Sequence, residues 1–220
     1  MFEYAPEGFT SNDFRWMPVR YSLDTPPIQR AIEAEDIAAL ADEFGVPAAH
    51  IDAVLHVEAG RSGFLLREPP PARPKILFEG HYFHRLTHGQ FDSQVPTLSY
   101  RRWTRKHYLG GSREWDRLET AWELDQEAAL QSASWGLGQV MGANHKAAGC
   151  DTVQQFVEEA FSGEPAQLRH MINFIKNNGL LDELRRGDWD SLAHGYNGPG
   201  YRANAYDHKL AQAARHSEFA

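Results

Sequence analysis

Cysteine is almost absent from this sequence: Cys150 is the single one in 220 residues. A disulfide within the chain is therefore impossible, and we expect the protein to fold in a reducing compartment. Long apolar runs are missing as well, because no stretch approaches the roughly 18 apolar residues of a membrane-spanning helix. Residues 1–8 do not combine a basic segment with an apolar one, so the sequence predicts neither a signal peptide nor insertion into a membrane.

Positive charge is also scarce. The 22 Lys and Arg residues are outnumbered by 30 Asp and Glu residues, which gives a formal net charge of −8 at pH 7. A protein that binds nucleic acid needs a stripe of cations to neutralise phosphates, and the sequence shows none, so we expect no nucleic-acid partner. The overall charge does not favour an anionic surface either, although it is compatible with a local basic patch.

The composition that remains is that of an ordinary globular protein. Hydrophobic residues make up 42% and charged residues 24% of the chain, which suffices for one large domain with a core. Residues 1–30 are rich in proline and aromatic residues and predict an extended arm laid on the domain. Residues 31–220 form the predicted main domain, and the aromatic content also suffices for a groove in which a sugar or another ligand stacks.

Apolar periodicity predicts a mainly α domain with a few short extended segments. A proline-rich connector is expected at 67–74 and a polar loop at 87–102. Helices are expected at about 36–44, 47–60, from 112 onward, 125–133, 144–148, 152–161, 165–178, 180–186, 189–196 and 204–216.

The helix at 47–60 carries the best candidate for an acid catalyst. Pro47 suits its first turn, and Ile51 and Leu55 recur at helical spacing. Glu58 falls on the same apolar face and in the last turn, where burial and the helix dipole would both raise the pKa of a carboxyl group. A raised pKa suits a proton donor near neutral pH. The alternative is a helix-terminal glutamate turned toward water.

Two glycine-containing turns, 133–142 and 194–201, combine polar side chains with aromatic ones. Their glycines allow the backbone to approach another group closely, and amides and tyrosine rings are suited to binding a sugar chain. The alternative for either turn is ordinary capping. The candidate binding residues are Ser134 and Gln139 in the first turn and Tyr196, Asn197 and Tyr201 in the second.

Four motifs in this order resemble the N-acetylmuramidase domain of phage endolysins: VEAG (57–60), ILFEGHYF (76–83), SWGLGQVMG (134–142) and YNGPGY (196–201). Goose-type lysozymes and soluble lytic transglycosylases are similar more distantly. The resemblance implies a lysozyme-like helical fold and cleavage of the β-1,4 bond between N-acetylmuramic acid and N-acetylglucosamine. It makes Glu58 the catalytic acid and places Gln139, Tyr196 and Asn197 around the acid and the sugar.

The sequence departs from the transglycosylase pattern in two ways. The acid and the Gly-Leu-x-Gln turn are close in sequence in transglycosylases, whereas a long insertion separates Glu58 from Gln139 here. The serine that usually follows the transglycosylase acid is Ala59. Transglycosylase roles therefore do not transfer directly to this chain.

A glycosidase ordinarily uses a second carboxylate, as nucleophile or as base for water. Glu79 is the best candidate by position, although it can equally be a structural acid paired with Arg85 or His81. Asp125 and Glu127 are more simply explained as a helix cap and a first-turn charge.

Three histidines suggest a zinc site with Glu79, as in a metallopeptidase, because His81, His84 and His88 would share one face of a helix. No His-Glu-x-x-His motif is present, so we expect no metal and no cofactor. Cys150 is expected to be a small buried residue.

The sequence thus predicts a monomeric peptidoglycan hydrolase whose partner is the glycan strand. We expect it to be made in a host cytoplasm and to act on the cell wall or in the periplasm after release; a secretion-system effector would give the same sequence features. The alternatives are a lytic transglycosylase that forms 1,6-anhydro products and a catalytically silent wall-binding module.

Overall fold

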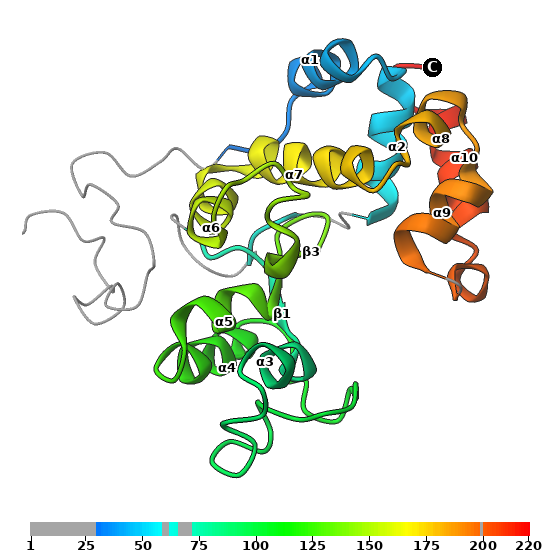
Figure 1. Ribbon diagram of the computed structural model, residues 1–220. Coiled ribbons are helices and arrows are strands. Elements are labelled where there is room, and N and C mark those ends of the chain that lie inside the picture. The colour runs from blue at the N-terminus through cyan, green and yellow to red at the C-terminus, as the bar shows by residue number, and fades with distance from the viewer. Residues whose placement is uncertain (1–29, 59–61, 66–71, 199) are drawn as a thin grey trace, which may run out of the picture.

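The computed structural model describes residues 30–58, 62–65, 72–198 and 200–220 (Figure 1). Apart from Arg30, the arm predicted at 1–30 lies outside the described residues. The described chain is mainly helical, with one small sheet. Its elements are α1 (Ala34–Phe44), α2 (Ala48–Glu58), β1 (Ile76–Phe78), α3 (Gly80–Leu86), α4 (Arg113–Trp122), α5 (Gln126–Gln131), β2 (Ala133–Trp135), β3 (Val140–Met141), the 3-10 turn η1 (Gly142–Asn144), α6 (Val153–Ser162), α7 (Glu164–Asn177), α8 (Leu181–Arg186), α9 (Trp189–Asn197), the 3-10 turn η2 (Tyr201–Asn204) and α10 (Tyr206–His216).

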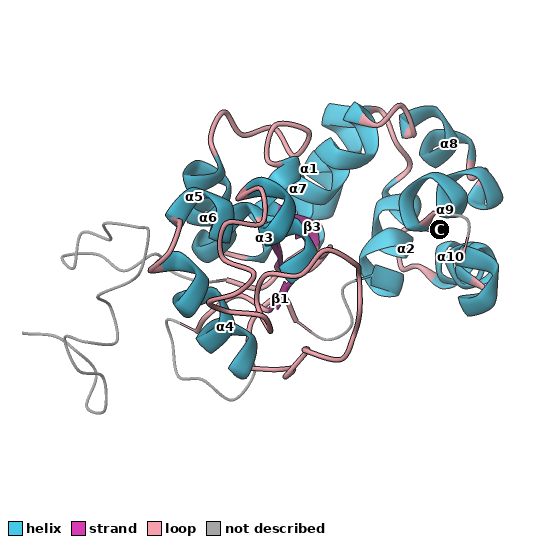
Figure 2. Cartoon of the chain, turned by 60° about the horizontal axis from the view of Figure 1, so that its bottom comes forward, coloured by secondary structure: helices cyan, strands magenta, loops and turns pink. Residues whose placement is uncertain are grey.

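The helices surround two hydrophobic cores. The first core lies among α3 to α6 and the sheet and contains Phe78, Phe83 and Trp115. The second lies among α1, α2 and α7 to α10 and contains Ile51 and Leu184. Helix α7 runs between the two groups of helices (Figure 1), and Figure 2 shows α2, α8, α9 and α10 on one side of the molecule with α3 to α6 on the other. This two-part helical architecture confirms the predicted mainly α fold.

The sheet is antiparallel, in the order β1-β2-β3. Its register pairs Leu77 with Ser134, and Ser134 with Met141, in one row across the three strands. Side chains alternate between the two faces of a sheet, so this row lies on one face and the neighbouring row on the other. The neighbouring row is fully buried, whereas Leu77 and Met141 are only half-buried. One face of the sheet therefore covers the first core and the other is partly open.

Several predicted helix ends are confirmed and others are wrong. Asp125 caps α5 by accepting a hydrogen bond from the amide of Ala128 at 2.9 Å, as predicted. Helix α1 begins at Ala34, earlier than predicted, because Glu33 is its N-cap and Asp36 bonds back to the amide of Glu33. The capping box thus puts Asp36 inside the first turn.

Three other predicted boundaries change for local reasons. Helix α5 ends at Gln131, before the predicted end, because the chain pairs as β2 from Ala133 onward. The helix predicted at 144–148 is wrong: η1 is followed there by turns. Helix α10 begins at Tyr206, since η2 occupies the preceding residues.

Among the described residues, no helix combines the length and the apolar character needed to cross a membrane.

Candidate active site

Glu58 is the last residue of α2, and its side chain lies outside the described part of the structure. Helix α2 turns the buried residues Ile51 and Val54 toward the second core. Beyond α2, the chain is fastened to the start of α7: the Ser62 hydroxyl and the Gly63 amide donate to Oε1 of Glu164 at 2.7 and 2.8 Å. The two ends of the segment that contains Glu58 are therefore anchored to the protein core.

The predicted turn at 133–142 is a β-hairpin, made by β2 and β3. The Ser134 hydroxyl donates to Oε1 of Gln139 at 2.8 Å. The amide nitrogen of Gln139 in turn donates to the carbonyls of Gly136 and Lys75 at 2.8 and 3.3 Å. Gln139 has a positive φ of 47°, which is costly for a residue with a side chain, so these three bonds hold a backbone shape that the turn alone disfavours.

The glycines of the hairpin turn permit contact with α7. A side-chain carbon added to Gly136 would lie 2.5 Å from the Gln167 side chain, and one added to Gly138 would lie 2.7 Å from the sulfur of Met171. Gln167 also accepts from the Leu137 amide at 2.9 Å and donates to the Ala160 carbonyl at 2.7 Å. The close approach predicted for these glycines is therefore made to a helix of the protein.

Tyr196 joins α9 to the same hairpin. Its hydroxyl donates to the carbonyl of Gly138 at 3.2 Å, and its ring meets Phe174 edge to face. Tyr196 and Asn197 form the last turn of α9, and the chain turns only at Gly198, so the predicted turn begins later than expected. The side chain of Asn197 lies outside the described residues.

Tyr201 is set apart from this group. It is buried in the second core, and its hydroxyl donates to Asp190 and accepts from Nε of Arg202 at 2.9 Å. Its ring lies against His194 of α9. Within the part of the chain that the structure describes, these contacts fix η2 against α9 and none of them reaches the hairpin.

Glu79 occupies the junction between β1 and α3 and is mostly buried, with 13% of its side chain exposed. Tyr108 donates its hydroxyl hydrogen to this carboxylate, with 2.7 and 2.8 Å to the two oxygens. Nδ1 of His81 lies 3.2 Å from Oε2. Of the two partners predicted for Glu79, His81 is the one found, whereas Arg85 stacks over the ring of Tyr82.

Burial shifts the pKa of both side chains that lie next to Glu79. It lowers the pKa of His81, which keeps this imidazole neutral at pH 7. Burial, together with the nearby carboxylate of Glu79, raises the pKa of Tyr108 well above its usual value. Tyr108 therefore keeps its proton and remains a hydrogen-bond donor to Glu79.

A buried ion pair supports β1, the strand that ends directly before Glu79. Nη1 of Arg117 lies 2.7 Å from Oε2 of Glu114 and also donates to the Phe78 carbonyl. Glu114 accepts from the amides of Phe78, Leu109 and Gly110 as well. One acid thus links β1, the loop before α4 and α4 itself.

Tyr108, Gln167 and Glu114 were not predicted as parts of the site. Tyr108 lies outside the predicted elements, between the polar loop and the helix from 112, whereas Gln167 and Glu114 lie in ordinary helical patterns. Their roles arise from contacts between segments distant in sequence, so no local pattern indicates them. The three histidines of the metal alternative do not converge either: His84 bonds Asp92 at 2.9 Å and His88 lies beyond the end of α3.

Described residues of the four motifs pack on the second core or belong to the sheet. Val57, next to Glu58, and Tyr196 both pack against the core that contains Leu137 of the hairpin turn. The strand before Glu79 pairs with the strand that contains Ser134. The hairpin thus lies beside β1, which precedes Glu79, and is hydrogen-bonded to Tyr196 of α9.

Comparison with known proteins identifies the family of the chain. The family model for N-acetylmuramidases matches residues 47–218. The crystal structure of the Burkholderia AP3 phage endolysin is similar over 84% of this chain and 70% of that one, with a TM-score of 0.77 and 34% sequence identity. No curated protein matches the chain. The chain therefore belongs to the N-acetylmuramidase family and is an endolysin-type glycoside hydrolase that acts on bacterial peptidoglycan.

Proposed function

We propose that Glu58 is the general acid of this muramidase and that it cleaves the β-1,4 bond between N-acetylmuramic acid and N-acetylglucosamine. The observation that carries the proposal is the convergence of the end of α2 with the hairpin and α9 on one core, through Val57, Leu137 and Tyr196. Position 58 continues the face of α2 that carries buried Ile51 and Val54. A carboxyl group on such a face has the surroundings that a proton donor needs.

The chemistry begins when Glu58 donates its proton to the glycosidic oxygen. The bond to the muramic acid then breaks through an oxocarbenium-like state, which must be captured by a nucleophile. Glu79 is our candidate for the second carboxylate, which holds the attacking water. A carboxylate offers about four lone-pair sites, and the Tyr108 hydroxyl occupies only some of those on Glu79.

The other predicted residues are assigned to shaping and lining the sugar site. Ser134 and Gln139 fix the hairpin, while Tyr196 holds it against α9 and offers an aromatic ring. We assign Asn197 to hydrogen bonding with the sugar, because it follows Tyr196 at the end of α9. Tyr201 contributes indirectly, since its contacts with Asp190 and His194 hold the segment after α9.

Water, and not the sugar's own hydroxymethyl group, is the proposed nucleophile. Support comes from Glu79, a carboxylate that directly follows the strand paired with the Ser134 strand and that can position a water molecule. Digested peptidoglycan should then yield muropeptides that end in N-acetylmuramic acid and that borohydride reduces to the alcohol. Products lighter by one water and inert to borohydride would show a 1,6-anhydro ring, which is the lytic transglycosylase reaction, and would overturn the proposal.

We further propose that the enzyme works as a monomer on glycan strands and reaches the cell wall after release from the cell in which it is made. Light scattering at the concentrations used for lysis tests the monomer, and a stable dimer would contradict it.

A further inference from the structure

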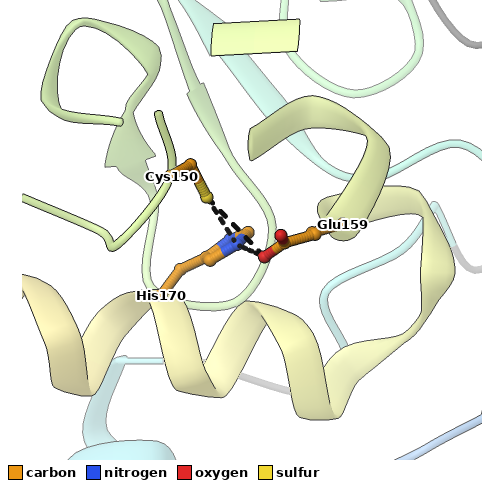
Figure 3. Close-up of side chains that lie close together, drawn as sticks. All are labelled: Cys150, Glu159 and His170. Carbon is orange, nitrogen blue, oxygen red and sulfur yellow. Dashed lines mark hydrogen bonds and ion pairs between the residues drawn. The ribbon is translucent and has the colours of Figure 1, made fainter. Parts of the chain in front are cut away.

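Three side chains outside the proposed active site point toward one another: Cys150, Glu159 and His170 (Figure 3). Sγ of Cys150 lies 3.5 Å from Nε2 of His170 and 3.6 Å from Oε2 of Glu159. The same Nε2 and Oε2 atoms are 2.8 Å apart. The three groups come from different segments, namely the loop before α6, α6 itself and α7, so only the tertiary fold brings them together.

The cluster lies at the edge of the protein interior. Cys150 and His170 are 2% and 3% exposed, and the imidazole stacks on Phe156. The Glu159 side chain is 37% exposed and borders the solvent. Two of the three groups are therefore fixed by packing, and the third gives access from outside.

We propose that Cys150, Glu159 and His170 form a binding site for a divalent transition metal of the zinc type. A thiolate, an imidazole and a carboxylate are a donor set that zinc and cobalt accept, whereas magnesium and calcium prefer oxygen ligands alone. A thiolate and a carboxylate also neutralise a divalent cation, which suits a largely buried position. Three protein ligands leave a fourth position for water on the side of Glu159.

The distances fit this coordination. Zinc binds sulfur at about 2.3 Å and nitrogen or oxygen at about 2.0–2.1 Å. In a tetrahedral site these bond lengths place a sulfur ligand roughly 3.5 Å from a nitrogen or oxygen ligand. They place a nitrogen ligand roughly 3.3 Å from an oxygen ligand. The two sulfur distances of 3.5 and 3.6 Å already match. The nitrogen–oxygen distance of 2.8 Å would open slightly as the metal replaces the shared proton.

The same residues do not form a thiol nucleophile with its relay. In such a relay the imidazole contacts the nucleophile with one ring nitrogen and the orienting acid with the other. Here Nε2 of His170 contacts both Cys150 and Glu159. Burial and the charge of Glu159 raise the pKa of Cys150 to about 12, which is opposite to what a reactive thiol needs.

Metal analysis of the purified, chelator-treated and zinc-reloaded protein tests the site. We expect one zinc per chain and, with cobalt instead, the near-ultraviolet absorption of a thiolate–cobalt bond. Cys150→Ala and His170→Gln should each weaken zinc binding by at least about 100-fold, beyond the loss typical of outer-shell changes. His84→Gln is the matched control, because His84 pairs with Asp92 at the similar distance of 2.9 Å without a cysteine nearby.

The cobalt spectrum of the unmodified protein keeps the test decisive if the variants do not fold. Absence of the thiolate–cobalt absorption at saturating cobalt would overturn the proposal. Zinc retained by Cys150→Ala but lost by His84→Gln would also overturn it, since the metal would then lie at the α3 histidines. Zinc should in addition raise the melting temperature, because it binds the folded state.

A second inference comes from the exposed loop of residues 100–112, between α3 and α4, here called the basic loop. Four cations lie within six residues of this loop, and residues 93–113 contain no acid at all. The four side chains are exposed: Arg101, Arg102, Arg105 and Lys106. Trp103 and Leu109, at 58% and 42% exposure, are the two exposed large hydrophobic residues of the described chain. The acidic protein thus carries a local basic patch with an apolar element in it.

The geometry points to the acidic peptide stems of peptidoglycan as the partner of the basic loop, an inference that rests on the proposed function. Guanidinium groups pair with carboxylates in two-bond geometry, and an exposed tryptophan can stack on a sugar ring. An anionic lipid surface would attract the same residues. Peptidoglycan with its peptide stems is favoured over a lipid surface because Tyr108, in this loop, bonds Glu79 of the proposed site.

Sedimentation with insoluble peptidoglycan tests this binding without turnover, in the Glu58→Gln background. The pair Arg101→Gln and Arg102→Gln should weaken binding about 10-fold at low salt, as should Trp103→Ala. The pair Arg186→Gln and Arg215→Gln, which removes the same charge from exposed positions on α8 and α10, should leave binding unchanged.

The choice of probe distinguishes the partners. Glycan strands stripped of their peptides should bind the variant with Arg101→Gln and Arg102→Gln and its parent equally, whereas Trp103→Ala should still weaken binding to them. A difference for the arginine pair that persists on stripped strands, or that appears only with vesicles of anionic phospholipid, would overturn the inference. Lysis by the wild-type chain tests the proposed function separately.

Discussion

Tyr108 and Glu79 are joined by a short hydrogen bond across the loop before α4, with 2.7 and 2.8 Å from the hydroxyl to the two carboxylate oxygens. If Glu79 positions the attacking water, loss of this donor should misplace the carboxylate. Tyr108→Phe keeps the ring that lies near Arg117 and removes only the hydroxyl. We expect kcat to fall about 10-fold or more, as for other losses of positioning, with KM little changed.

Glu79→Gln should lower activity further than Tyr108→Phe, but less than loss of the general acid. Glu79 also begins α3, so melting curves must accompany the kinetics. If both variants keep full activity and melt normally, Glu79 is neither the second carboxylate nor a positioning residue, and the water must be held by another group.

The buried pair of Glu114 and Arg117 makes a prediction about stability. Arg117→Met would leave Glu114 buried with its charge unpaired, which costs about 3–5 kcal/mol in comparable cases. Arg169→Met removes the exposed partner of Glu43 and should cost less than about 1 kcal/mol. Urea unfolding measures both, and equal costs would contradict the structural role of the buried pair.

The pH dependence of stability follows from Glu114. Burial alone would raise the pKa of its carboxyl group, but hydrogen bonds from Gly110, Arg117, Leu109 and Phe78 outweigh burial and hold the pKa below the usual 4.5. A carboxyl group whose pKa is lower in the folded than in the unfolded state contributes its full stabilisation at pH values above its unfolded-state pKa. This contribution is lost as the pH falls through its folded-state pKa. Between about pH 7 and 5 the contribution of Glu114 stays constant, and the melting temperature should fall modestly because the pKa of His81 is lower in the folded than in the unfolded state. Below about pH 4.5 it should fall further as the contribution of Glu114 is lost, and a rise on acidification would contradict this assignment.

Tyr196→Phe tests the wall of the site. The variant loses one hydrogen bond to the Gly138 carbonyl, of 3.2 Å, and such a bond contributes about 0.5–1.5 kcal/mol to stability. Turnover should nevertheless fall 10- to 1,000-fold if the ring and hydroxyl orient the sugar and the acid. A melting temperature that falls while turnover stays constant would make Tyr196 purely structural.

Gln139→Ala should lower both turnover and stability. All three of the Gln139 side-chain hydrogen bonds are made within the hairpin and to β1, and its backbone has positive φ. The expected fall in turnover is of the same size as for Tyr196→Phe, because a relaxed hairpin no longer presents its groups in one geometry. Full activity for both variants would mean that the hairpin and α9 do not line the site.

The sequence predicted most helices because apolar periodicity and caps act locally, as Asp125 shows at the start of α5. It did not predict the sheet, since β1 and β2 are only three residues long and pair across a long separation. The motif residues Ser134, Gln139 and Tyr196 were predicted, and the structure brings them together through Gly138 and the hairpin. Their partners were not, because Tyr108 and Gln167 acquire their roles only when distant segments meet.

The acid itself is tested by Glu58→Gln, which has nearly the same shape but cannot give up a proton to a leaving group. General acid catalysis contributes about 10²- to 10⁴-fold to rate, so clearing of purified peptidoglycan should slow by at least about 100-fold. Stability should hardly change, because glutamine keeps the helix propensity of glutamate at the end of α2.

Glu35→Gln, a change at an exposed glutamate in α1, is the control and should lyse at the normal rate. Binding to peptidoglycan should persist in the Glu58 variant, so that lost lysis reflects lost chemistry. If that variant clears the suspension at more than about a tenth of the wild-type rate, the proton comes from another residue and Glu58 is not the general acid.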